Sequence, residues 1–169
     1  MTYAPVERIA ARHETDGFDC GSDAQTNWLR RHALQADRSD STRVMVVTRQ
    51  DEHRVVGYHA LSAGSVEPAA APGRITKGLP RHPVPVVLLT RLGVDRSEQG
   101  RGLGRALVKD ALLRVAAAAE TIAARALLVH CESEEARAFY LRLAEFEASP
   151  TDPLHLYLLM ADLRRASGS

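Results

Sequence analysis

Cysteine is scarce in this chain of 169 residues, and its two cysteines, Cys20 and Cys131, stand far apart. They form neither a C-x-x-C pair nor a Cys/His pattern with the spacing of a zinc site. We therefore expect no disulfide framework and no metal site, and a reducing compartment suits such a chain.

Long apolar runs are also missing. No run of apolar residues is long enough to cross a bilayer, and the first eight residues lack the basic start and apolar core of a secretory signal. These absences predict a soluble protein that stays in the cytoplasm and makes no membrane contact. The length and the 45% hydrophobic content fit one globular domain over residues 1–169.

A large net charge is the third absence. Twenty-two basic and twenty-one acidic side chains give +1, so binding to a nucleic acid would depend on an uneven distribution of charge. The distribution is uneven, because arginines gather in the early and central parts of the chain and glutamates gather after residue 131. An ordinary solvated surface explains this pattern as well as a polyanion site does.

Glycines are concentrated at residues 99–104, between an apolar run at 86–94 and an alanine- and leucine-rich stretch at 106–119. A strand, a glycine turn and a helix in this order form an anion site. The glycines let the backbone approach a ligand, and the free N–H groups at the helix start bind phosphate. The segment predicts a pyrophosphate site.

The spacing of the glycines narrows the choice among phosphate-containing ligands. A dinucleotide-binding fingerprint beginning at Gly100 would need glycine or alanine where Arg105 stands, and the G-x-x-x-x-G-K-[ST] loop has no match. The remaining pattern is Q-x-x-G-x-G, formed by Gln99, Gly102 and Gly104. A plain strand-to-helix turn is the alternative interpretation of these glycines.

The rest of the chain predicts a mixed α/β sheet from the order helix, hairpin, loop, strand, helix, strand, helix and strand. A capping box at Ser22 and Gln25 begins the first helix, and Ser133 can cap the last one. The expected ranges are a helix from 22 to about 35, hairpin strands at 44–48 and 55–61, a proline-rich loop or broken helix at 64–85, a strand at 86–94, a helix from 103 to 119, a strand at 125–131, a helix from 133 to about 144 and a strand at 154–160.

This order, the loop at 99–104 and the aromatic pair Phe139 and Tyr140 resemble the GNAT family of N-acetyltransferases over nearly the whole chain. The resemblance implies a GNAT fold, with a mixed, mostly antiparallel central sheet flanked by helices. More narrowly, the chain resembles the acetyltransferase toxins of bacterial toxin–antitoxin pairs in the strings at residues 18–21, 28–29, 56–61, 85–89, 139–140 and 149–154.

The resemblance implies an activity and a set of partners. Acetyl-CoA would be the co-substrate, and the α-amino group of aminoacyl-tRNA would receive the acetyl group, which arrests translation. A ribbon-helix-helix antitoxin would neutralise the toxin and repress the operon with it, so that operator DNA is bound only through the complex. We also expect a homodimer.

The resemblance also implies the site residues. Tyr140 is the expected acid, because a phenol with a pKa of about 10 stays protonated at neutral pH and can donate to the departing thiolate; an ordinary core tyrosine is the alternative. Arg101 and Arg105 can equally be surface arginines, and Ser133 a simple helix cap. The residues expected to contact acetyl-CoA are Leu92, Val94, Gln99, Gly100, Arg101, Gly102, Leu103, Gly104, Arg105, Ser133 and Phe139.

The chain has no obvious motif for a general base. An α-amino group, with a pKa of about 8, is partly neutral at pH 7, whereas a lysine amine near about 10.4 needs deprotonation. The missing motif therefore favours an α-amine, and none of the four possible proton relays is assigned: Glu98, Glu132, His59 and His130. The expected tRNA phosphate contacts are Arg30, Arg31, Arg81 and Arg91.

The helix end, the function and the antitoxin contact each leave alternatives open. Ala144 and Glu145 precede Phe146 where the family often has a single glycine, which puts the end of the catalytic helix in doubt. An acetyltransferase for a small amine or a protein N-terminus, and a non-catalytic acyl-CoA-binding module, remain alternative functions. A strand edge at 154–163, with Arg164 and Arg165, is a candidate antitoxin contact.

Overall fold

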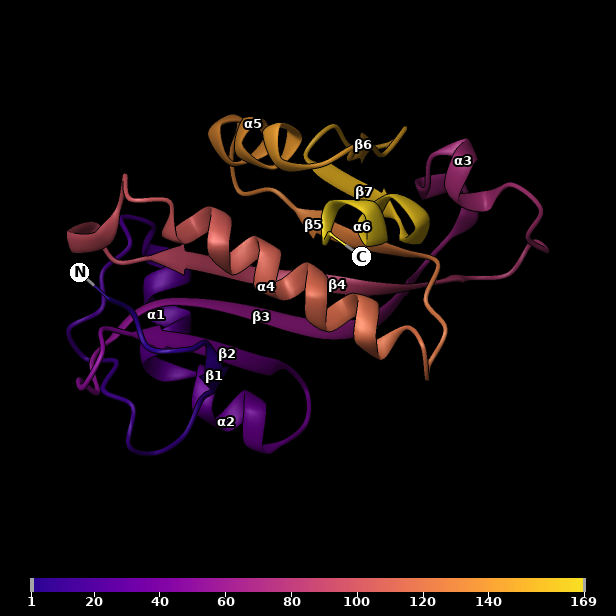
Figure 1. The fold of residues 1–169 in the computed structure, drawn as a ribbon. Coiled ribbons are helices and arrows are strands. Elements are labelled where there is room, and N and C mark those ends of the chain that lie inside the picture. Colours follow the sequence, from indigo (N-terminus) through magenta and orange to yellow (C-terminus); the bar gives the residue numbers. More distant parts are fainter. Residues whose placement is uncertain (1, 169) are drawn as a thin grey trace. The chain divides into compact units, whose positions relative to one another are not determined.

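The computed structural model describes residues 2–168 and contains a seven-stranded sheet in the order β1-β2-β3-β4-β5-β7-β6 (Figure 1). The chain divides into two compact units, and β3, β4 and α4 contribute residues to both. The first unit holds Met1–Ser62 and Thr90–Asp110; the second holds Ala63–Leu89 and Ala111–Ser169.

The elements follow the predicted order, with additions. They are β1 (Glu7–Arg8), α1 (Asp23–Arg31), α2 (Ala33–Arg38), β2 (Arg43–Thr48), β3 (Val55–Val66), η1 (Pro68–Ala70), α3 (Gly73–Thr76), β4 (Val84–Val94), η2 (Arg96–Glu98), α4 (Leu103–Ala118), β5 (Ala126–His130), α5 (Glu134–Leu143), β6 (Glu147–Ala148), β7 (His155–Leu159) and α6 (Met160–Ala166). The predicted fold class, a mixed and mostly antiparallel sheet flanked by helices, is confirmed.

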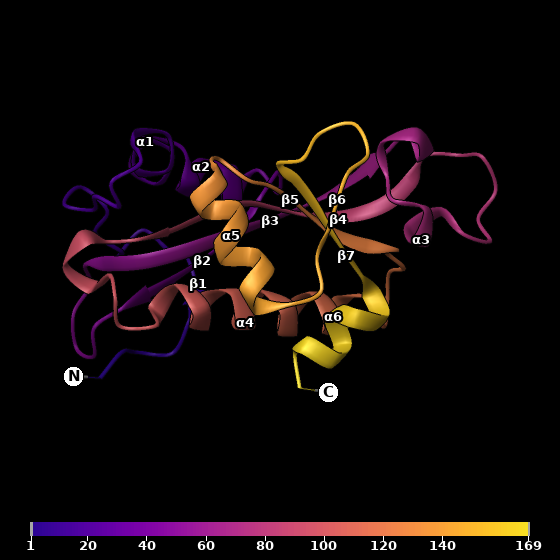
Figure 2. The ribbon, with the colours of Figure 1, turned by 90° about the horizontal axis from the view of Figure 1, so that it is seen from above.

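In the first unit, β2 and β3 form the predicted antiparallel hairpin, and each of its faces is covered by helices. Because side chains alternate along a strand, Val46 faces a core shared with Leu29 of α1 and Ala33 of α2, whereas Val47 packs with Leu103 and Leu107 of α4. Figure 2 shows α1 and α2 on one side of these strands and the start of α4 on the other. This packing fixes the start of α4 on the sheet.

The first helix is shorter than predicted. Its N-terminus is as expected, because the Ser22 hydroxyl accepts a hydrogen bond from the Gln25 N–H at 3.3 Å. The helix ends at Arg31, since His32 leaves the helical conformation at φ −124° and ψ −23°, and α2 begins directly after it. Leu29 and Ala33, on either side of this break, both reach the core.

In the second unit, β4 pairs in parallel with β5, and β7 lies antiparallel between β5 and β6. Leu128 of β5 and Tyr157 of β7 bury their side chains with Ile75 of α3, so the predicted proline-rich loop contains a helix that covers the sheet. The prediction of a strand through 160 was wrong at its end. The chain turns into α6 at Met160, which places Arg164 and Arg165 on a helix, and β7 is not an edge strand.

Candidate functional site

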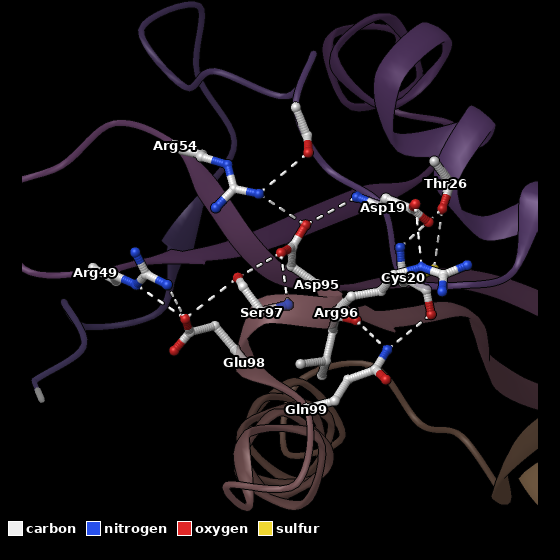
Figure 3. A network of polar contacts seen from close by, with 12 residues as sticks. Asp19, Cys20, Thr26, Arg49, Arg54, Asp95, Arg96, Ser97, Glu98 and Gln99 are labelled. Atoms are coloured by element: carbon white, nitrogen blue, oxygen red, sulfur yellow. Dashed lines mark hydrogen bonds and ion pairs between the residues drawn. The ribbon is translucent and has the colours of Figure 1, made fainter.

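The glycine loop of the first unit lies between β4 and α4 and begins at a buried carboxylate. Asp95 accepts hydrogen bonds from the Ser97 N–H at 3.1 Å, the Ser97 hydroxyl at 2.6 Å and the Asp19 N–H at 2.9 Å (Figure 3). Arg54 completes the cluster with an ion pair at 3.1 Å. Burial would raise the pKa of Asp95, but these hydrogen bonds and Arg54 lower it, so the carboxylate stays ionised and holds the loop entrance.

Glu98 anchors the same loop to two distant parts of the chain. Its fully buried carboxylate accepts a hydrogen bond from the Tyr3 hydroxyl at 2.6 Å and two from the Arg49 guanidinium, one of them at 3.0 Å from Nε. Arg101 lies 3.8 Å away as a further ion-pair partner. The hydrogen bonds from Tyr3 and then Arg49 lower the pKa of Glu98. Glu98 is therefore a structural anchor of the loop rather than a free proton relay.

Replacement of Glu98 by glutamine should destabilise the first unit. The amide keeps the size of the side chain but removes the charge that compensates Arg49, so we expect the free energy of unfolding to fall by about 2–3 kcal/mol. Urea unfolding of both proteins measures this difference. Glu52→Gln, an exposed change of the same type, should stay within about 0.5 kcal/mol of wild type. Equal effects of the two changes would contradict the anchoring role.

Gln99 closes the loop with its side chain, whose amide nitrogen forms hydrogen bonds within the protein. Its Nε2 donates to the carbonyl oxygens of Cys20 and Val94, each at 2.9 Å. Gly100 and Gly102 follow with φ of 80° and 83°, a conformation that favours glycine, and no atom lies within 4 Å of where a Cβ would stand on either. The loop is thus fixed on one side and open on the other.

Backbone N–H groups line up at the start of α4. The Gly102 carbonyl accepts the first intrahelical hydrogen bond, from Ala106 at 3.1 Å. The N–H groups of Leu103, Gly104 and Arg105 therefore have no acceptor within the helix. The apolar side chain of Leu103 packs into the core with those of Leu92 and Val94. Only the backbone atoms of these three residues can therefore bind a polar ligand. Open glycines and unpaired helix-start donors are the features that a pyrophosphate site requires, and this loop has both.

The second unit carries the predicted acid. Ser133 caps α5 by accepting a hydrogen bond from the Ala136 N–H at 3.1 Å, as expected. Tyr140 is 6% exposed, and its ring makes edge-to-face contacts with Phe139 at 5.2 Å and Phe146 at 5.8 Å between centroids. Within residues 2–168 the Tyr140 hydroxyl makes no hydrogen bond, so it is free to donate one.

Burial keeps protons on Tyr140 and its neighbour Cys131. Desolvation, and then the nearby Cys131, raise the pKa of the Tyr140 hydroxyl well above its ordinary value of 10. Desolvation likewise raises the pKa of the Cys131 thiol to about 11, an effect that Arg137 opposes. Tyr140 is therefore fully protonated at neutral pH, which is the state that an acid requires.

The raised pKa of Cys131 makes the stability depend on pH. The unfolded chain loses the thiol proton near pH 9 and the folded chain near pH 11, so the free energy of unfolding falls as pH rises above 9. Between pH 8 and 10.5, wild type should lose about 2 kcal/mol more than Cys131→Ala in urea unfolding, because the variant lacks this titration. Parallel pH profiles of the two proteins would show that the thiol is not shielded from water.

The departure at Ala144 and Glu145 does not disturb the helix. The last residue of α5 is Leu143, and Ala144 is extended at φ −161°, so this turn does not need a glycine. The Phe146 N–H donates to the Ala144 carbonyl oxygen at 2.9 Å, and the Phe146 ring still packs on Tyr140.

The remaining candidates have diverse surroundings. His59 is fully buried, with its Nε2 2.8 Å from Asp110, whereas His130 stacks on His155 at 3.9 Å between ring centroids. Of the four predicted tRNA contacts, Arg30, Arg31 and Arg91 belong to the first unit and Arg81 to the second, and all except the half-buried Arg91 are exposed.

Among residues 2–168, neither a group of metal-ligating side chains nor a membrane-spanning helix is found.

Sequence reasoning missed two parts of this arrangement. Asp95 and Glu98 hold the loop, yet their partners are remote in sequence: Asp19 and Tyr3 lie near the N-terminus. The available signal was the presence of two carboxylates directly between an apolar strand and a glycine turn. The predicted cofactor residues fall into two groups: those between 92 and 105 lie in the first unit, and Ser133 and Phe139 lie in the second, as does the predicted acid Tyr140.

Comparisons with known proteins agree with these observations. The model of the acetyltransferase (GNAT) family matches residues 9–146. A tRNA-acetylating toxin of Mycobacterium tuberculosis is 48% identical over 166 residues, which cover 98% of both chains. A tyrosine-to-phenylalanine mutant of KacT has a TM-score of 0.90 at 28% identity, covering 98% of this chain and 99% of its own. AtaT complexed with acetyl-methionyl-tRNAfMet has a TM-score of 0.87 at 29% identity, covering 95% and 97%.

Other structures of these two proteins include their partners. AtaTR bound with acetyl-CoA has a TM-score of 0.83 at 28% identity, covering 97% of both chains. The KacTA–DNA complex has a TM-score of 0.81 at 28% identity, with the same coverage. AtaT is also seen bound to the C-terminus of the antitoxin AtaR, at 25% identity.

Proposed function

Because the chain belongs to the acetyltransferase (GNAT) family, we propose that it transfers the acetyl group of acetyl-CoA to the α-amino group of aminoacyl-tRNA and thereby arrests translation. The observation that carries this proposal is the 48% identity to a tRNA-acetylating toxin across 98% of both chains. The AtaT complex with acetyl-methionyl-tRNAfMet supports the same substrate class. The co-substrate is acetyl-CoA.

Each need of this reaction has a residue that fits it. Acetyl-CoA supplies a thioester whose carbonyl carbon accepts an amine. The N–H groups of residues 103–105 hold the pyrophosphate, and a backbone N–H near Val94 donates to the thioester carbonyl oxygen. As the new C–N bond forms and the C–S bond breaks, Tyr140 donates its proton to the departing sulfur. The amine's own proton passes to water, and water returns a proton to the Tyr140 oxygen, so that the net products are the amide and the free thiol of CoA.

Two of the four possible proton relays, Glu98 and His59, have surroundings that favour an α-amine over a lysine. Glu98 is engaged by Tyr3 and Arg49, and His59 lies buried against Asp110, so neither is placed to remove a proton from a substrate. An amine with a pKa of about 8 supplies its own neutral fraction at pH 7. The aminoacylated end of a tRNA carries an α-amine of this kind.

We extend the proposal to regulation and assembly. The AtaT–AtaR and KacTA–DNA structures support neutralisation by an antitoxin that carries the complex to operator DNA. A cytoplasmic site of action follows from the proposed substrate. We also propose that residues 1–169 work as a single acetyltransferase domain and that two protomers pair, which sedimentation of the purified protein would test.

Cell-free translation tests the proposed function. Protein synthesis should stop when the purified protein and acetyl-CoA are both present, continue when either is left out, and recover when the antitoxin is added before the protein. An acetyltransferase for small amines, or a module that only binds acyl-CoA, would leave translation running. Continued synthesis with both components present would therefore contradict the proposal.

A further inference from the structure

A tryptophan and an arginine lie against each other in the first unit, outside the residues proposed for catalysis. Trp28 of α1 is half-buried, and its ring lies nearly parallel to the buried Tyr58 ring, at 12° and 6.1 Å between centroids. The Arg91 guanidinium carbon is 5.4 Å from the centre of the Trp28 ring. This distance is that of a cation–π contact.

The guanidinium of Arg91 is held in place on α1. Its Nη1 donates to the Gln25 side-chain oxygen at 3.4 Å, and the Tyr58 hydroxyl donates to the Gln25 carbonyl oxygen at 2.7 Å. Within residues 2–168, no carboxylate forms an ion pair with Arg91. Arg91 therefore presents a positioned, planar cation whose charge is not neutralised by the protein.

The position of Arg91 on β4 relates it to the acetyl group. Alternation along the strand puts Arg91 on the same face as Gly93, whose Cβ position would meet Tyr58 and Phe18. Leu92 and Val94 face the opposite core. Arg91 precedes Val94, where the thioester carbonyl is proposed to lie, by about 10 Å along the strand. Arg91 therefore lies near the strand position to which the substrate is proposed to deliver its amine.

We propose that Arg91 and Trp28 form a stacking site for an unpaired nucleobase next to the aminoacyl group of the RNA substrate. The inference rests on the proposed function, because that function supplies an RNA with an unpaired 3′ end. Exposed RNA bases stack on aromatic rings and on the planes of arginine guanidinium groups, and a held guanidinium loses little freedom on binding. Arg91 would then recognise a base, and not only a phosphate as its charge alone predicts.

Tryptophan fluorescence can report on binding at this site. Because Trp28 is the only tryptophan, a base stacked beside it should quench the whole tryptophan emission of the protein. The probes are a deacylated tRNA with an intact 3′ end and the same tRNA with its terminal nucleotides removed. Intact tRNA should quench the emission, and the trimmed tRNA should quench it much less.

An exchange of arginine for lysine separates stacking from charge. Arg91→Lys keeps the charge and loses the plane, so we expect about a tenfold weaker affinity for intact tRNA. Arg38→Lys, the same exchange at an exposed arginine in the last turn of α2, should stay within about twofold of wild type. The Kd for CoA should be the same in wild type and Arg91→Lys, because CoA binding does not involve the RNA end.

The outcomes distinguish this inference from the proposed function. If wild type acetylates charged tRNA but intact tRNA does not change its tryptophan emission, the proposal of a stacking site is wrong and the proposed function stands. If intact and trimmed tRNA quench equally, or Arg91→Lys binds as tightly as wild type, the site is likewise overturned. Quenching by the antitoxin but by no RNA would assign this surface to a protein partner. If wild type acetylates no charged tRNA, the proposed function itself fails.

Discussion

Tyr140→Phe should strongly slow acetyl transfer while the protein stays folded and still binds acetyl-CoA. General acid catalysis typically contributes about 10²- to 10⁴-fold to the rate, and kcat should fall by this factor. The change removes only the hydroxyl, which makes no hydrogen bond within residues 2–168, so no buried partner is left unpaired. The ring contacts with Phe139 and Phe146 remain.

Tyr157→Phe is the matched control. Tyr157 lies in the same unit, is 1% exposed, and has a pKa that burial also raises, but it stands on β7 among core residues. Its loss should leave kcat within about twofold of wild type. In wild type, the raised pKa of Tyr140 keeps the acid protonated, so kcat should not fall as pH rises from 7 to 10. A Tyr140→Phe protein with wild-type kcat would remove Tyr140 from the mechanism.

Gly102→Asp should weaken acetyl-CoA binding by about 100-fold or more. The open space at the Cβ position of Gly102 lies beside the free N–H groups of α4. A carboxylate there would occupy the position of the pyrophosphate and repel its negative charge. Aspartate tolerates a positive φ better than most residues and favours helix starts, so the loop should still form. Calorimetric titration with CoA measures the change in Kd.

Gly78→Asp separates the effect of charge from the strain of the backbone. Gly78 has nearly the same conformation, at φ 79°, and also has no atom within 4 Å of its Cβ position, but it lies in the second unit after α3. It should bind CoA with wild-type affinity. Equal losses of affinity in both variants would mean that the open loop at residues 99–104 is not where the pyrophosphate binds.

Features governed by neighbouring residues were predictable from the sequence. The cap at Ser133 depends on one hydroxyl and a backbone N–H three residues away, and the strand, glycine turn and helix around residue 100 are continuous in the chain. The hairpin of β2 and β3 is equally local. The pyrophosphate loop could therefore be proposed before the fold was known.

Features that depend on distant contacts were not predictable. The two-residue strands β1 and β6 have no periodicity to detect, and each is a strand only because it pairs with β2 or β7. The role of Glu98 depends on Tyr3 and Arg49, which are brought to it by the fold. Arg91 is similar, since its charge is visible in the sequence but its contact with Trp28 is not.

Transfer of labelled acetyl from acetyl-CoA to a pool of charged and deacylated tRNA shows directly whether the aminoacyl α-amine is the acceptor. We expect label on charged tRNA alone, released when the aminoacyl ester is hydrolysed, and lost in Tyr140→Phe. Label on deacylated tRNA would place the acetyl group on the RNA itself and contradict an α-amine substrate. Absence of label from both pools, in a protein that still binds acetyl-CoA, would contradict the tRNA substrate altogether.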